Sequence, residues 1–244
     1  MNRTIRIAMW SGPRNISTAM MRSFGNRADT FVCDEPFYAH YLKSTRIEHP
    51  GADEVMAHHE TDWRKVIEFV LGDTPTGASI FYQKHMSHHL LAEIDRGWID
   101  RVTNCFLIRD PSEVLTSLIK HYPNPTLRDT GLPQQVEIFD QVKRKTGKTP
   151  PVIDAMDVLQ EPRRMLGLLC DAVGVEFHDT MLSWPAGRRA TDGIWAKHWY
   201  DAVERSTGFQ PYKPKQEPLP DELRALAAQC QELYSYLHGF RLKQ

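Results

Sequence analysis

An apolar strand, a Gly-Pro turn and a helix follow one another at the start of the chain and constrain its fold more than any other feature. The apolar run Thr4–Trp10 predicts a β-strand, and Ser17–Arg27 has the spacing of a helix. Such a unit directs free backbone N–H groups, and the positive end of a helix dipole, at one point. The turn adds a guanidinium and two hydroxyl groups, from Arg14, Ser17 and Thr18. The segment therefore predicts a phosphate-binding loop.

Further strand candidates alternate with helix candidates along the chain. The strands are expected at Thr30–Cys33, Ala78–Gln83, Val102–Ile108 and Pro151–Ala155. The helices are expected at Thr61–Leu71, Met86–Asp95, from Pro111 onward, Pro133–Lys145, Glu161–Val173 and Asp221–His238. This alternation predicts an α/β, three-layer P-loop-type fold, with a central parallel sheet of about five strands flanked by helices. We expect one domain over residues 1–244, with a C-terminal helix within 220–240.

Residues 38–60 carry little periodicity and predict a mobile excursion or a helical lid, which extends to about residue 75. In sheets of this kind ligands bind beyond the carboxyl ends of the strands. The segments at 11–18, 34–37, 84–89 and 109–117 are therefore the candidate site.

Composition limits the class of protein. Acidic and basic residues nearly cancel, 31 against 30, so no global field favours nucleic acid or an anionic membrane as a partner. The four cysteines form no CxxC pair, which favours buried structural thiols in a reducing compartment. The chain starts without an apolar leader, and no stretch approaches the roughly 18 apolar residues of a membrane span. A soluble, cytoplasmic enzyme is expected.

The phosphate loop departs from the nucleoside-triphosphate signature GxxxxGK[ST]. With Gly12 as its first glycine, Ser17 stands at the second glycine, Thr18 at the lysine and Ala19 at the metal-binding hydroxyl. The loss of both the lysine and that hydroxyl argues against magnesium-ATP as the ligand. A metal-free anhydride donor suits the loop better.

The loop resembles the 5′-phosphosulfate loop of the sulfotransferase family, Pro-[Lys/Arg]-Ser-Gly-[Ser/Thr]-[Ser/Thr]. Four positions match, and Asn15 and Ile16 replace the serine and the glycine. An isoleucine would be strained if that position needs a positive φ. The resemblance implies that the nucleotide is bound by Pro13, Arg14, Asn15, Ile16, Ser17 and Thr18.

A second segment resembles the family's 3′-phosphate motif, an apolar strand that ends in arginine with a serine eight residues later. Arg109 and Ser117 have that spacing. The alternative is that Arg109 pairs with Asp110 or with a helix carboxylate. The stretch from Gly187 to Lys197 is similar to the family's basic loop, which implies a 3′-phosphate contact from Arg188 or Arg189, although an arginine pair is also an ordinary surface feature.

The resemblance, which covers most of residues 4–200, implies sulfuryl transfer from 3′-phosphoadenosine 5′-phosphosulfate (PAPS) to a hydroxyl or amine of a small-molecule acceptor, without a metal. Arg14 would steady the bridging oxygen and the leaving phosphate. Two strand-end residues are candidate general bases, Glu35 and His85, and Glu35 is slightly favoured. A capping carboxylate or a buried histidine is the structural alternative for each.

Several clusters leave alternatives open. His85, His88 and His89 can share a helix face and chelate a metal, but HExxH is absent and a histidine-lined acceptor pocket is favoured. Aromatic residues near the basic loop stack on adenine or belong to the core: Trp195, Trp199, Tyr200 and Phe209. A magnesium-dependent P-loop kinase, or a nucleotide-binding protein without catalysis, remains the alternative function. The acceptor and the oligomeric state stay open.

Overall fold

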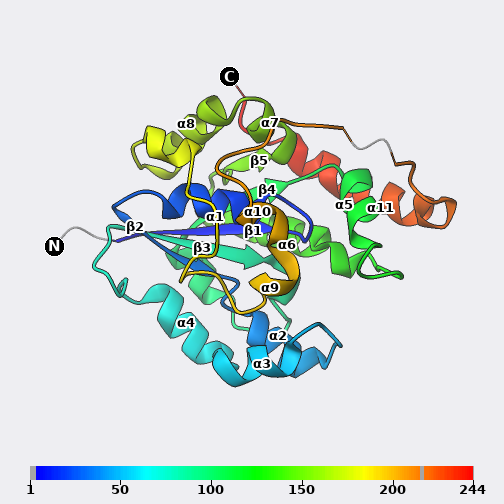
Figure 1. The fold of residues 1–244 in the computed structure, drawn as a ribbon, viewed down its shortest axis with the longest axis horizontal. Coiled ribbons are helices and arrows are strands. Elements are labelled where there is room, and N and C mark those ends of the chain that lie inside the picture. The colour runs from blue at the N-terminus through cyan, green and yellow to red at the C-terminus, as the bar shows by residue number, and fades with distance from the viewer. Residues whose placement is uncertain (1–3, 215–216, 244) are drawn as a thin grey trace.

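A parallel five-stranded sheet forms the centre of the computed structural model, which describes residues 4–214 and 217–243 (Figure 1). The leaderless start expected at residues 1–3 lies outside the described residues. The strands are β1 (Ile5–Ser11), β2 (Thr30–Asp34), β3 (Ile80–Met86), β4 (Thr103–Ile108) and β5 (Val152–Asp154). Their order in the sheet is β2-β3-β1-β4-β5, and every neighbouring pair is parallel. The expected α/β fold with about five parallel strands is confirmed.

Helices cover both faces of this sheet. The helix α1 (Ser17–Gly25) packs on β2 and β3, where Phe24 stacks on Tyr82 with the ring centroids 4.4 Å apart. On the opposite face α6 (Leu132–Thr146) packs on β1 and β4, and Phe139 meets Phe106 edge-on at 5.5 Å. The remaining helices used below are α5 (Pro111–Leu118), α7 (Ala155–Gln160), α8 (Pro162–Val173), α9 (Ala196–Trp199), α10 (Asp201–Glu204) and α11 (Arg224–His238).

The excursion after β2 is helical. It consists of α2 (Tyr38–Thr45), α3 (Ala52–His58) and α4 (Trp63–Leu71), which Figure 1 shows together below the sheet. Asp62 caps α4 by accepting a hydrogen bond from the Arg64 amide at 2.9 Å. Of the two expectations for this segment, the helical one matches its secondary structure.

The helix expected over Met86–Asp95 does not form. The strand β3 continues to Met86, and only a 3₁₀ turn, Ser87–His89, follows it. Met86, the first residue of the expected helix, pairs instead with Ser11 in the β1–β3 ladder, whose hydrogen bonds outweigh a weak helical spacing there. Ser87 then ties the turn to β1 by donating to the Ser11 carbonyl at 3.1 Å. The three histidines of this segment consequently share no helix face.

Two expectations about the rest of the chain hold. All four cysteines are buried and free. The C-terminal helix α11 forms, and the chain after it returns to the sheet, where the Leu242 amide donates to the Val152 carbonyl at 2.8 Å. Among the helices of the described residues, none combines the length and the apolar character that crossing a membrane requires.

Candidate functional site

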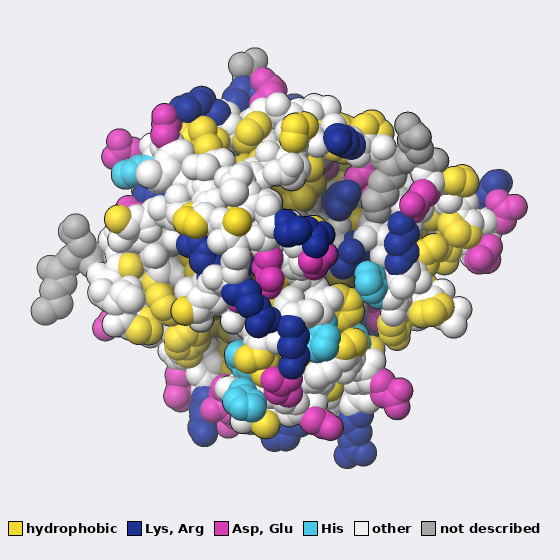
Figure 2. Space-filling view, viewed as in Figure 1, with side chains coloured by type: hydrophobic (Ala, Val, Ile, Leu, Met, Phe, Trp, Pro, Cys, Tyr) yellow, Lys and Arg dark blue, Asp and Glu magenta, His cyan; other side chains and the backbone are white. Residues whose placement is uncertain are grey.

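A cavity of about 640 Å³ opens at the carboxyl ends of the strands, a size typical of small-molecule sites. One part, here called the loop end, is formed by residues 13–19, Arg109, Ser117 and residues 206–213. The other part, the histidine end, is formed by Glu35, Tyr38, Tyr41, residues 47–50, the end of β3 with its turn, His121, Tyr122, Asp129, Trp195 and Trp199. Figure 2 shows Lys and Arg side chains near the middle of the face that carries α9 and α10.

The loop end presents the uncapped N-terminus of α1. Ile16 precedes the helix and offers no side-chain cap, and the first turn holds no acidic residue. By contrast, Asp62, Asp110 and Asp154 cap α4, α5 and α7. The loop is held close to its neighbour, since a Cβ on Gly12 would lie 2.1 Å from the Thr130 carbonyl oxygen. The free N–H groups and the positive dipole of α1 therefore meet the cavity without a protein anion.

The strain anticipated at Ile16 is absent, because that residue has φ −85°. The left-handed residue of the loop is Arg14, with φ 57°, a conformation uncommon outside glycine and found where surrounding contacts enforce it. Two such contacts are present: Arg109 Nη1 donates to the Arg14 carbonyl and Arg14 Nε donates to Ser117 Oγ, each at 2.8 Å. The structure thus brings together Arg14, Arg109 and Ser117.

Arg109 also pairs with a helix carboxylate, as one of the alternatives supposed. Its Nε and Nη2 donate to Glu113 Oε2 at 2.9 and 2.8 Å, which fixes the guanidinium beside the loop. Burial and the neighbouring Arg109 lower the pKa of Arg14 from its ordinary value. Two arginines that repel each other while lining one cavity favour the binding of an anion between them.

The second strand end holds a buried network around Lys84. Its Nζ donates to Asp34 Oδ1 at 2.8 Å, to Glu35 Oε1 at 2.5 Å and to the Tyr200 hydroxyl at 2.7 Å. Asp34 lies opposite Lys84 in the β2–β3 register, so their side chains share one face of the sheet. An ammonium has three donors, and all three are used here.

Glu35 follows β2 with φ 43°, and this left-handed turn brings its carboxylate back to Lys84. Burial raises its pKa above the ordinary value, while Lys84 opposes that shift. Its other oxygen, Oε2, lies 3.9 Å from His89 Nδ1. The carboxylate therefore has one oxygen held by the lysine and one beside a histidine that lines the cavity.

His85 does not reach the cavity. Successive side chains of a strand point to opposite faces, so Lys84 and Met86 line the cavity and His85 packs on the other face. There it stacks on Trp10 at 4.5 Å, and burial lowers its pKa to about 3. The structural alternative, a buried histidine, describes this residue.

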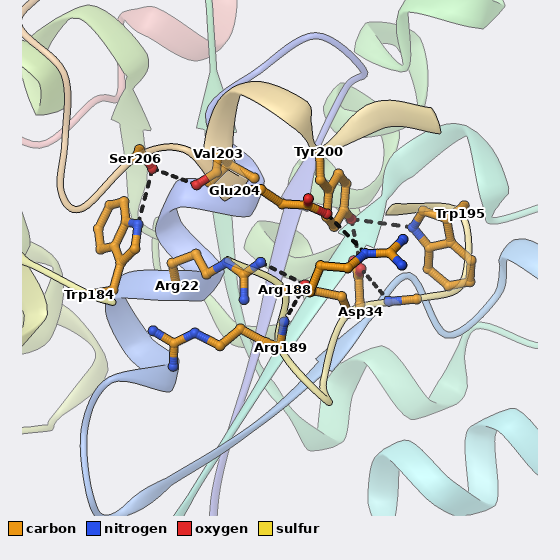
Figure 3. A network of polar contacts seen from close by, with 12 residues as sticks. Arg22, Asp34, Trp184, Arg188, Arg189, Trp195, Tyr200, Val203, Glu204 and Ser206 are labelled. Atoms are coloured by element: carbon orange, nitrogen blue, oxygen red, sulfur yellow. Dashed lines mark hydrogen bonds and ion pairs between the residues drawn. The ribbon is translucent and has the colours of Figure 1, made fainter. Parts of the chain in front are cut away.

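Arg188 and Arg189 also lie away from the cavity lining. Arg188 is exposed and pairs with Glu204, while the Arg189 amide donates to Asp192. Figure 3 shows both arginines. Their segment is held by the ion pair of Arg22 and Asp192, 2.6 Å long, and by a 3.1 Å hydrogen bond from the Gly193 amide to Asp34. Further along the chain, Phe209, Tyr212 and Lys213 line the loop end. Phe209 is among the aromatic residues that the sequence offered for stacking on adenine, whereas Tyr212 and Lys213 belong to no sequence motif.

Aromatic side chains and imidazoles pack against one another at the histidine end. Tyr38 and Tyr41 stack on His89 at 4.8 and 4.6 Å. Burial lowers the pKa of His88 to about 4 and that of His89 well below its usual value, so both imidazoles are neutral near pH 7. Among the residues that the structure describes, no group of three or more His, Cys, Asp or Glu side chains is arranged to hold a metal ion.

A curated plant protein is similar to this chain over nearly the whole of this chain's length. The chain is 36% identical over 234 residues to branched-chain-amino-acid aminotransferase-like protein 1 of Arabidopsis thaliana, covering 96% of this chain but 41% of that relative. It therefore spans less than half the length of the relative that it matches.

Two solved structures share the fold at low identity. The sulfotransferase from Alicyclobacillus acidocaldarius has TM-score 0.58 at 13% identity, over 98% of this chain and 97% of that one. The sulfotransferase domain from the Synechococcus PCC 7002 olefin synthase has TM-score 0.53 at 13% identity, over 96% of both chains. A family model described as a sulfotransferase domain matches residues 5–236, nearly the whole chain. Because this model covers far more than half of the chain, the chain belongs to the sulfotransferase family.

Proposed function

We propose that this sulfotransferase moves a sulfuryl group from PAPS to a hydroxyl of a small-molecule acceptor held at the histidine end. The observation that carries the proposal is one cavity that joins an uncapped helix N-terminus and two arginines to a buried carboxylate, Glu35. Cationic and dipolar groups suit the donor's phosphates, and a carboxylate suits the proton that the acceptor must lose.

The loop end fits a nucleotide with separate phosphates. We assign the 5′-phosphosulfate to the loop, residues 13–18, where Gly12 lets the backbone approach Thr130. We assign the 3′-phosphate to Arg109 and Ser117, which Arg14 links to the loop through its 2.8 Å hydrogen bond to Ser117. Because Arg188 and Arg189 lie elsewhere, Lys213 replaces them in this proposal as the further cation beside the 3′-phosphate.

The chemical step needs a base and an arginine. The acceptor oxygen attacks sulfur in line, the bond between sulfur and the 5′-phosphate oxygen breaks, and the acceptor proton passes to Glu35 Oε2. Arg14 stabilises the negative charge that develops on the leaving phosphate. The raised pKa of Glu35 favours this role, because a base works best when its pKa approaches the working pH. His85, stacked on Trp10 away from the cavity, has no part in the step.

Calorimetry separates this proposal from its alternatives. Adenosine 3′,5′-bisphosphate is expected to bind in the micromolar range without metal, and ATP with magnesium is expected to bind far more weakly. Preferential binding of ATP with magnesium would overturn the proposal in favour of a P-loop kinase. Binding of the bisphosphate together with full transfer activity in Glu35→Gln would overturn the assignment of the base.

A further inference from the structure

The ionisable side chains that line the cavity are divided by sign. Within residues 4–214 and 217–243, the lining arginines Arg14 and Arg109 and the lysine Lys213 lie at the loop end. The lining carboxylates lie at the histidine end and come from three separate segments: Glu35, Glu48 and Asp129. A donor that carries several negative charges fits the first end, and the second end disfavours an anionic acceptor.

The one lysine at the histidine end does not change this balance. Each of the three N–H groups of Lys84 has a protein acceptor, namely Asp34, Glu35 and Tyr200. Arg46 and Arg128, which lie on segments that contribute to this end, are exposed and do not line the cavity. A carboxylate on the acceptor would therefore meet carboxylates without a free cationic donor beside them.

Neutral rings surround the same space. Tyr38 has His89 on one face and the edge of Trp195 at 5.1 Å, and Trp199 meets the ring of His49 at 6.3 Å. The imidazoles add no positive charge near pH 7, because burial lowers the pKa of each of His49, His88 and His89. Rings with negative faces beside carboxylates are the surroundings that bind organic cations.

A buried polar atom marks where the acceptor's polar group fits. His89 Nδ1 has no hydrogen-bond partner, although its side chain is only 4% exposed. It lies 3.9 Å from Glu35 Oε2, too far for a direct hydrogen bond. A hydroxyl placed beside both atoms accepts a hydrogen bond from His89 Nδ1–H and donates its own proton to Glu35 Oε2.

We infer that the histidine end binds a small amino alcohol in its cationic form and presents the hydroxyl to Glu35. This inference rests on the proposed sulfuryl transfer. The ammonium lies among the rings and near Asp129 and Glu48, which keep it protonated and therefore not nucleophilic. The hydroxyl attacks sulfur, its proton passes to Glu35 Oε2, and the products are the amino alcohol sulfate ester and adenosine 3′,5′-bisphosphate.

Binding of matched probes tests the inference without requiring turnover. The full chain, saturated with adenosine 3′,5′-bisphosphate, is titrated with choline, 2-aminoethanol, the neutral choline isostere 3,3-dimethylbutan-1-ol, and glycolate. Choline or 2-aminoethanol is expected to bind at least about tenfold more tightly than the neutral isostere, and glycolate most weakly. Equal or tighter binding of the isostere or of glycolate, or no binding of either cation, would overturn the inference.

Variants locate the bound cation. Asp129→Asn and Glu48→Gln are each expected to weaken cation binding several-fold while leaving the isostere unchanged. Asp171→Asn, an exposed acid on α8 far along the chain from the cavity lining, is the matched control and is expected to change neither. Cation binding that survives both variants would place the cation elsewhere and contradict the inference.

The design also separates this inference from the proposed function. The bisphosphate is titrated first, so its failure to bind would overturn the donor assignment alone, and the cation series is then repeated without nucleotide. Bisphosphate binding with no preference for cations would overturn the acceptor class and leave the donor assignment in place.

Discussion

The two ends of the cavity are built in different ways. The loop end is centred on a contiguous strand, turn and helix. Its two arginines are both fixed by contacts to α5: Arg14 to Ser117, and Arg109 to Glu113. The histidine end gathers side chains from α2, the 47–50 segment, the turn after β3 and α9. The first end resembles other phosphate sites because backbone geometry makes it. The second end follows from how segments distant in the sequence pack, so it is where relatives of one fold are free to differ.

Glu35→Gln gives the largest expected effect and tests whether the two ends act separately. The amide still accepts a hydrogen bond from Lys84 but cannot take the acceptor proton, so we expect kcat to fall about 10²- to 10⁴-fold. Affinity for adenosine 3′,5′-bisphosphate should stay within about twofold, a change below 0.5 kcal/mol. Sulfuryl transfer from PAPS to the tightest-binding amino alcohol, with calorimetry on the bisphosphate, measures both. A parallel loss of nucleotide affinity would mean that the ends are coupled.

Arg109→Ala tests whether a change at the loop end leaves binding at the histidine end intact. Loss of charged hydrogen bonds should weaken bisphosphate binding about 10- to 100-fold, while cation binding at the histidine end is retained. Arg188→Ala is the control: Arg188 is exposed, pairs with Glu204 and does not line the cavity, so we expect no change. Calorimetry on the three proteins decides, and a larger effect from Arg188 would restore the arginine pair to the 3′-phosphate site.

Lowering the pH should reduce the stability of the fold by protonating buried imidazoles, while the arginines keep their charge. His85 and His88 have folded-state pKa values lowered to about 3 and about 4, so their neutral forms stabilise the fold. This stability is fully present above the unfolded-state pKa of about 6.5 and declines as the pH falls toward the folded-state values. Each imidazole contributes at most about 1.4 kcal/mol per pH unit.

Urea unfolding between pH 7.5 and pH 5 measures this slope. His85→Gln removes one such imidazole without touching the cavity lining, so its free energy of unfolding should depend less on pH than that of the parent chain. Identical slopes in the two proteins would show that burial of His85 does not hold it neutral.

Lys213→Ala carries the smallest expected effect. Because Lys213 is exposed, salt screens its charge, and we expect only a loss of about three- to fivefold in affinity for the 3′,5′-bisphosphate. Binding of adenosine 5′-monophosphate should be unchanged. Titrations of both nucleotides at low and high ionic strength check this, and an equal loss for the two would place Lys213 away from the 3′-phosphate.

Sequence patterns recovered the fold well where they were strong and local. The strand–turn–helix at the start, the arginine with a serine eight residues later, and the long helices α6, α8 and α11 all form close to their expected bounds. The helix expected over Met86–Asp95 fails at its start, because the pairing of Met86 with β1 and the hydrogen bond from Ser87 to the Ser11 carbonyl are tertiary contributions that no local window contains. The expected strain at Ile16 fails for a related reason, since Arg14 takes the left-handed conformation instead.

The same distinction between local pattern and tertiary packing applies to the site. The residue types of the loop end follow from the sequence, because a helix N-terminus is an anion site wherever a strand and a tight turn precede it. The sequence does not tell which of Lys84 and His85 faces the cavity. Neighbouring side chains of a strand point to opposite faces, so a shift of one residue decides which of them lines the cavity and which stacks on Trp10. Lys213 and Asp129 carry no local signal, and only chain packing brings them to the lining. The sequence by itself determined the residues of the proposed phosphate-binding loop, and the tertiary structure decided which side chains surround the proposed acceptor site, since burial and neighbours set the charge of each ionisable group there.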